Sequence, residues 1–113
     1  MYNFSFWNFS FSNGYGGAVF WSGARGTLAD CVLTDNSVNF TNVANATNVT
    51  YMGGGAIFWS GINGNLNNCI FIDNNDFINL LGTGGGAVYW NGTNGILTEC
   101  YFNNNTSYNT GGA

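Results

Sequence analysis

Residues Gly16–Gly23 read GGAVFWSG, and this stretch decides the fold because it returns twice almost unchanged. The second copy, Gly54–Gly61, reads GGAIFWSG, and the third, Gly85–Gly92, reads GGAVYWNG. A fourth copy starts at Gly111–Ala113. Self-similarity at a spacing of a few tens of residues is typical of repeat architectures. The chain is therefore expected to be a stack of similar units.

Each copy continues with a Gly, a Leu and a Cys in a fixed order, and an Asn follows each Cys by five positions. The Gly-Gly-Ala motifs and the cysteines share the same spacings, 38 residues for the first step and 31 for the second. The length variation therefore falls between each Asn and the next Gly-Gly-Ala. A solenoid behaves in this way, with a constant cross-section and loops of free length on one side.

The apolar runs inside the repeat are short and show no helical period. Gly-Ala-Val-Phe-Trp reads as one strand, and the Leu-x-x-Cys segment reads as another after a Gly-marked bend. Two or three strands per repeat without a crossover helix favour an all-β fold, a right-handed parallel β-helix (β-solenoid) of about three to four rungs. We assign one domain, 1–113, with repeats near 16–53, 54–84 and 85–110 and partial rungs at 1–15 and 111–113.

Stacking at roughly 4.8 Å per rung places each side chain over its equivalent. We expect the Leu, Cys and Leu/Phe columns to face inward, with Cys acting as a small apolar residue. The Asn column is expected at a bend, where amides hydrogen-bond along the stack and Asn tolerates left-handed backbone. Val19 and Phe20 lie on opposite faces of one strand, so one apolar column faces outward, and the sequence leaves open which. The predicted ladders are Ala18/Ala56/Ala87/Ala113, Phe20/Phe58/Tyr89, Trp21/Trp59/Trp90, Leu28/Leu66/Leu97, Cys31/Cys69/Cys100, Leu33/Phe71/Phe102 and Asn36/Asn74/Asn105.

The amino-acid composition argues against several classes of function. The 113 residues include a single basic residue, Arg25, and no His, and the formal net charge is -4. The shortage of acid–base groups argues against an enzyme and predicts no cofactor, and the lack of a basic face argues against nucleic acid as a partner. Hydrophobic residues make up 45% of the chain, which is enough to fill a core. No apolar stretch is long enough to predict a membrane span.

The three repeats, GGAVFWSGARGTLADCVLTDNS, GGAIFWSGINGNLNNCIFIDNND and GGAVYWNGTNGILTECYFNNNTS, resemble the repeats of adhesin-like surface proteins of methanogenic archaea. More distantly they resemble repeats of polymorphic outer-membrane proteins and autotransporter passengers. The resemblance covers most of Gly16–Ala113. It implies a long extracellular β-helix that projects from the cell envelope and mediates adhesion. The chain departs from that family in being much shorter and in showing no wall or membrane anchor.

Sequons for N-glycosylation, Asn-x-Ser/Thr, are frequent. Chance supplies several of them in a chain so rich in Asn and Thr, so unmodified Asn is the alternative. The long segment Val38–Met52 holds a cluster and is the best placed for sugar. The candidate sites are Asn3, Asn8, Asn39, Asn45, Asn48, Asn91, Asn104 and Asn105.

The three cysteines do not form a zinc motif, because they are widely spaced and lack both a Cys-x-x-Cys pair and a His. Stacked neighbours can approach disulfide distance. An odd number leaves at least one thiol free, and buried reduced thiols are the preferred interpretation. The predicted file is Cys31, Cys69 and Cys100.

The acids occupy repeat-equivalent positions, Asp35 with Asp73, and Asp30 with Glu99. Polysaccharide-active β-helix enzymes use surface carboxylates, but no Lys or His completes a site here, so we interpret these acids as residues of a duplicated turn. The Gly-Gly-x-Gly-x-Asp motif of calcium-binding β-rolls is absent. Arg25 is interpreted as a residue at the surface of a bend.

The column Trp21/Trp59/Trp90 has two interpretations. If it faces solvent, it forms an apolar stripe for lateral packing or for stacking on a glycan. Otherwise it is a buried column of the core.

The ends of a short β-helix expose unpaired backbone edges. Gly111–Ala113 followed by Met1–Tyr15 would place 18 residues before Gly16, about one minimal coil. Head-to-tail stacking of copies into a filament is therefore one expectation. The other is a segment of a longer surface stalk, covered by neighbouring rungs of the same chain.

The predicted function is that of an extracellular, cell-surface structural protein of the adhesin type. The alternative is a module that binds carbohydrate or another cell, and a polysaccharide-active enzyme is the least favoured. Met1–Trp7 lacks the regions of a signal peptide. Either a leader has been removed or the chain belongs to something larger.

Overall fold

The computed structural model describes residues 4–7, 10–12, 16–39, 53–77, 84–108 and 111–113, with side chains from Gly16 onward. The predicted all-β class is confirmed, because these residues form short β-strands and no helix. The strands are β1 (Phe4–Trp7), β2 (Ser10–Ser12), β3 (Val19–Trp21), β4 (Thr27–Ala29), β5 (Cys31–Thr34), β6 (Ser37–Asn39), β7 (Ile57–Trp59), β8 (Asn65–Asn67), β9 (Ile70–Ile72), β10 (Asn75–Asp76), β11 (Val88–Trp90), β12 (Ile96–Thr98), β13 (Tyr101–Asn103) and β14 (Thr106–Ser107).

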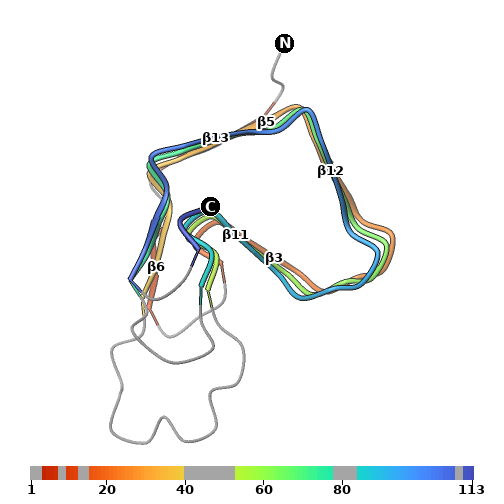
Figure 1. Ribbon diagram of the computed structural model, residues 1–113, viewed down its shortest axis with the longest axis horizontal. Helices are drawn as coiled ribbons and strands as arrows, with labels where there is room; N and C mark the ends of the chain where they lie inside the picture. Colours follow the sequence, from red (N-terminus) through yellow and green to blue (C-terminus); the bar gives the residue numbers. More distant parts are fainter. Residues whose placement is uncertain (1–3, 8–9, 13–15, 40–52, 78–83, 109–110) are drawn as a thin grey trace, which may run out of the picture.

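The strands stack into four parallel sheets, a topology compatible with a β-solenoid. We call them the GGA sheet (β3-β7-β11), the Leu sheet (β4-β8-β12), the Cys sheet (β1-β5-β9-β13) and the loop-side sheet (β2-β6-β10-β14). Figure 1 looks down the stack, and strands of one sheet lie over one another. We refer to residues 16–39, 53–77 and 84–108 as the first, second and third coils. Each coil contains four short strands, more than the two or three that the sequence predicts.

The register confirms the predicted ladders. Phe20 pairs with Phe58, and Phe58 with Tyr89. Leu66 lies between Leu28 and Leu97 in the same way. Phe71 lies between Leu33 and Phe102 in the Cys sheet, and backbone hydrogen bonds link the Ala residues of successive coils. A slip of one residue would turn every core side chain outward, so this register is strongly specified.

Left-handed residues turn the chain at the corners of each coil. The first corner uses glycine, at Gly16, Gly54 and Gly85. Seven of the nine residues at the other three corners are Asn or Asp, the side chains that adopt positive φ most readily. These corner residues are Arg25, Asn63 and Asn94; Asp30, Asn68 and Glu99; and Asp35, Asp73 and Asn104.

The second glycine of the Gly-Gly-Ala motif lets the coil close on itself. A Cβ atom at Gly17 would lie 2.6 Å from the carbonyl oxygen of Ser37, in the loop-side sheet of the same coil. Gly55 and Gly86 lie equally close to the backbone of the loop-side strands in their own coils. The start of the GGA sheet therefore packs backbone to backbone against the end of the coil, and no side chain fits between them.

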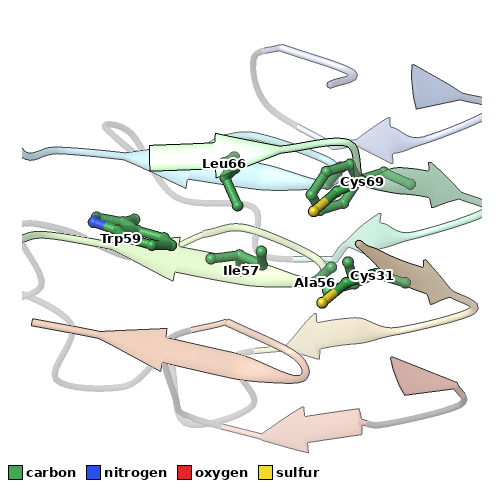
Figure 2. Close-up of a cluster of buried hydrophobic side chains, with 9 residues drawn as sticks. Cys31, Ala56, Ile57, Trp59, Leu66 and Cys69 are labelled. Atoms are coloured by element: carbon green, nitrogen blue, oxygen red, sulfur yellow. The ribbon is translucent and has the colours of Figure 1, made fainter. Parts of the chain in front are cut away.

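The core runs along the stack and is most complete in the second coil. Figure 2 shows Ile57, Trp59 and Leu66 pointing into the interior, with the sulfur atoms of Cys31 and Cys69 in successive coils. All five side chains are fully buried. The Val/Ile and Trp columns of the GGA sheet therefore line this core. The Phe/Tyr column lies on the opposite face of the sheet, where Phe20 is exposed and Phe58 is buried between its two stacked neighbours. This settles the orientation that the sequence left open.

The N-terminal strands correspond to the second half of a coil. β1 pairs with β5, and β2 pairs with β6. The described N-terminal residues, 4–7 and 10–12, therefore add strands to the Cys and loop-side sheets.

Candidate functional site

A ladder of side-chain amides runs through the three coils. Asn36 and Asn74 are fully buried. The side-chain oxygen Oδ1 of Asn74 accepts hydrogen bonds from Nδ2 and from the backbone N–H of Asn36, at 3.0 and 3.1 Å. Oδ1 of Asn105 accepts from the same two groups of Asn74, at 2.9 and 3.0 Å. The predicted Asn ladder is therefore confirmed.

The ladder amides also bond to the Cys sheet. Nδ2 of Asn74 donates to the carbonyl oxygen of Leu33 at 2.9 Å, and Nδ2 of Asn105 donates to that of Phe71 at 3.0 Å. A buried amide is stable only when its donors and acceptors are satisfied. One prediction needs correction, because the left-handed residue is not the ladder Asn. It is the preceding residue, Asp35 or Asp73 in the first two coils.

The cysteines stack in one file, as predicted. All three are free thiols, and each Sγ donates to the carbonyl oxygen two residues earlier, at 3.1 to 3.5 Å. Burial raises the pKa of Cys31 above its ordinary value and raises the pKa of Cys69 to about 11. Cys31 and Cys69 therefore stay protonated at neutral pH and act as small apolar core residues.

The tryptophan column is part of the core. Trp59 is 0% exposed, and its ring stacks on those of Trp21 and Trp90 with centroids 4.8 and 4.9 Å apart. The lateral or glycan contact considered for this column would find no exposed ring at Trp59. The rings lie against glycines at the next corner: a Cβ at Gly64 would lie 2.6 Å from Cε2 of Trp59. This contact explains why a Gly follows each Trp by five positions.

The repeat-equivalent acids sit at left-handed corners, which agrees with their interpretation as turn residues. Asp30 accepts a hydrogen bond from Nδ2 of Asn68 at 2.9 Å, and Asp73 accepts one from Nδ2 of Asn104 at 2.6 Å. Arg25 also occupies a corner, as predicted. Within the described residues, no group of three or more His, Cys, Asp or Glu side chains is arranged to hold a metal ion.

The candidate glycosylation sites fall in different surroundings. Asn91 and Asn104 are exposed, whereas Asn39 and Asn105 are partly buried. Asn3, Asn8, Asn45 and Asn48 lie outside the described residues, and so does most of the segment Val38–Met52.

Sequence reasoning missed two features. Asp76 is a carboxylate only 1% exposed, at a position of the loop-side sheet that holds Val38 in the first coil. Its Oδ2 accepts a hydrogen bond from the hydroxyl of Ser107 at 3.4 Å. The second feature is a pair of exposed rings, Phe77 and Tyr108, in edge-to-face contact with centroids 5.5 Å apart. Asp76 has no acid at the equivalent position of the other coils, and Phe77 and Tyr108 lie just beyond the quoted repeats, so no pattern marked them.

Comparison with known proteins found no match among protein-family models, curated proteins or solved structures. In the part of the chain that the structure describes, no helix is long and apolar enough to cross a membrane.

Proposed function

We propose that the chain is a structural module of an extracellular, cell-surface protein of the adhesin type, built as a right-handed parallel β-helix. The observation that carries the proposal is that one set of side chains, from the corner residues to the Asn, Cys, Trp and Leu columns, repeats coil after coil in constant register. Such residues serve to extend a rod. The right-handed sense follows from the strong preference of parallel strands for right-handed connections.

The coils propagate end to end, either as a segment of a longer stalk or through head-to-tail stacking of copies. The third coil supports both arrangements. Leu97 there is 49% exposed, whereas its equivalent Leu66 is fully buried beneath the third coil. Backbone hydrogen bonds from Gly86 to Gly111, and from Ala87 and Val88 to Ala113, continue the stack beyond this coil.

A test of location and form uses native cells. An antibody raised against this chain should label the cell surface in immunogold electron microscopy, and the label should lie on thin projections. Label confined to the cell interior would rule out the extracellular role. Sedimentation of the purified chain then separates the two arrangements, because only head-to-tail stacking gives an average mass that rises with concentration.

The second candidate, recognition of a glycan or another cell, is favoured by the exposed rings of Phe77 and Tyr108, since aromatic faces stack on sugars. A glycan-array signal that disappears in Tyr108→Ala, while the fold and Tm stay unchanged, would support binding. Trp59→Ala is unsuitable for this test because Trp59 is a core residue.

A further inference from the structure

We propose that Asn91 is an N-glycosylation site of the folded protein and that Asn104 and Asn105 are not, an inference that rests on the extracellular location proposed above. Three sequons lie wholly within described residues: Asn91-Gly92-Thr93, Asn104-Asn105-Thr106 and Asn105-Thr106-Ser107. Each needs a free amide nitrogen Nδ2 on the Asn, an accessible hydroxyl two residues later and space for a bulky sugar at the surface.

Asn105 fails on all three requirements. Its Nδ2, the atom that would carry the sugar, donates to the carbonyl oxygen of Phe71 at 3.0 Å, and its Oδ1 holds Asn74. The hydroxyl of Ser107 donates to the carboxylate of Asp76. A glycan at this position would break the ladder, so a glycosylated molecule could not complete the coil.

Asn104 is exposed, but the amide and the hydroxyl of its sequon are hydrogen-bonded to the neighbouring coil. Its Nδ2 donates to Oδ1 of Asp73 at 2.6 Å, a hydrogen bond to a charged acceptor. The hydroxyl of Thr106 donates to the side-chain oxygen of Asn75. Both groups that glycosylation requires are therefore bonded to the second coil.

Asn91 meets every requirement. Both Asn91 and Thr93 are exposed, at the corner between β11 and β12. The corner is held by the backbone, since the N–H of Asn91 donates to the carbonyl oxygen of Trp59 at 2.8 Å. The side chain of Asn91 makes no hydrogen bond within the described part of the chain, so a sugar there leaves the coil intact.

The neighbouring coils leave room for one glycan at this corner. The equivalent residues are Ser22 and Ser60, so only the third coil carries Asn. Rungs lie roughly 4.8 Å apart, which is less than the width of a sugar ring with its hydration. Sugars on successive rungs would collide, whereas a single one on Asn91 extends freely into solvent.

The donor class is an oligosaccharide linked to a lipid phosphate, and an oligosaccharyltransferase of the cell catalyses the transfer. Nδ2 of Asn91 forms a bond to the anomeric carbon, the bond from that carbon to the phosphate oxygen breaks, and the lipid phosphate leaves. One proton of the amide is lost to a base of the transferase. The product amide keeps one N–H.

The test is to secrete the full chain from a host that performs N-glycosylation, and to map each site by peptide mass spectrometry after enzymatic deglycosylation in heavy-oxygen water. We expect Asn91 to be modified, and Asn104 and Asn105 to be unmodified in the folded, secreted fraction. Asn91→Ser and Thr93→Ala restore the residues of the first coil, Ser22 and Ala24. Each variant should lose the glycan mass from this site without a change in Tm beyond that of the deglycosylated protein.

Modification of Asn104 or Asn105 in folded protein would overturn the proposal. So would an unmodified Asn91 in a host that glycosylates a control secreted protein in the same culture. Neither result bears on the extracellular role, because that role is tested separately by immunogold labelling of native cells.

Discussion

The amide of Asn36 donates from Nδ2 to Oδ1 of Asn74 at 3.0 Å, although the two residues are 38 positions apart in the chain. The bond joins equivalent corners of successive coils and recurs between Asn74 and Asn105. It shows how a chain with almost no charged residues specifies a register: buried amides must meet their partners, and a shifted coil would leave them unpaired.

Removal of the central amide should therefore be costly. Asn74→Ala removes the oxygen that accepts from Nδ2 and the backbone N–H of the buried Asn36, and the Nδ2 group that donates to Asn105, so we expect a loss of roughly 3 kcal/mol in the free energy of unfolding. The matched control is Asn67→Ala, because Asn67 is only partly buried and its equivalent in the first coil is Ala29. Chemical denaturation measures both variants. An equal, small effect of the two changes would contradict a structural role for the ladder.

A Cβ at the corner beside the tryptophan column should also destabilise the fold. In Gly64→Ala the methyl group overlaps the indole of Trp59, and the expected cost is about 2 kcal/mol, as for overpacking of a core. In Gly23→Ala the methyl group meets only Nε1 of Trp21, at 3.6 Å, so this variant should be close to wild type. Thermal unfolding followed by tryptophan fluorescence compares the two variants. A Tm of Gly64→Ala equal to that of the wild type would be evidence against the packing described.

Substitutions in the leucine column can show whether copies of the chain stack on the third coil. Leu66→Ala should lower the free energy of unfolding by about 3 kcal/mol, because Leu66 is fully buried. Leu97→Ala should cost roughly 1 kcal/mol if the third coil stays open, since about half of that side chain is exposed. If copies stack head to tail, Leu97→Ala should cost more than this, up to the value for Leu66→Ala, and its cost should grow with protein concentration. Urea titrations at two protein concentrations distinguish these outcomes.

Alkaline pH should destabilise the protein through Cys69. Burial raises the pKa of this thiol from 9.0 to about 11 in the folded state, while the unfolded thiol ionises near 9.0. Between pH 9 and 11 the unfolded chain therefore binds fewer protons than the folded one, and the free energy of unfolding falls as pH rises through this window. Cys69→Ala should flatten the wild-type slope there. A slope that is unchanged in the variant would show that Cys69 does not cause it.

Two corner residues, Arg25 and Glu99, are of types that are poorly suited to left-handed backbone. Arg25 has φ of 58°, and the same position holds Asn63 in the second coil. Arg25→Asn should raise the free energy of unfolding by about 0.5 kcal/mol, because Asn adopts this conformation at lower cost. The reciprocal change, Asn63→Arg, should lower it by a similar amount. Opposite shifts in Tm are the expected result, and shifts of the same sign would argue against a backbone origin.

Much of the fold follows from the sequence because equivalent residues of successive repeats lie next to one another in a solenoid. The Gly-Gly-Ala motifs and the cysteines are separated by the same numbers of residues at each step of the repeat. This agreement is enough to place Cys31 beside Cys69, since each coil pairs with the next in constant register. The all-β class, the ladders and the role of the acids at turns depend on that repetition alone. Residues whose type does not recur from coil to coil, such as Asp76, could not be singled out in this way.

Only the tertiary structure decided which way the columns face and which side chains are available for chemistry. Local alternation places Phe20 and Trp21 on opposite sides of a strand, but both sides are apolar, so the sequence alone cannot distinguish core from exterior. In the structure the indole of Trp59 lies in the core, in space that a Cβ at Gly64 would fill. In the same way, Asn91 and Asn105 carry equivalent sequons, and they differ because one amide faces solvent while the other is bonded within the stack.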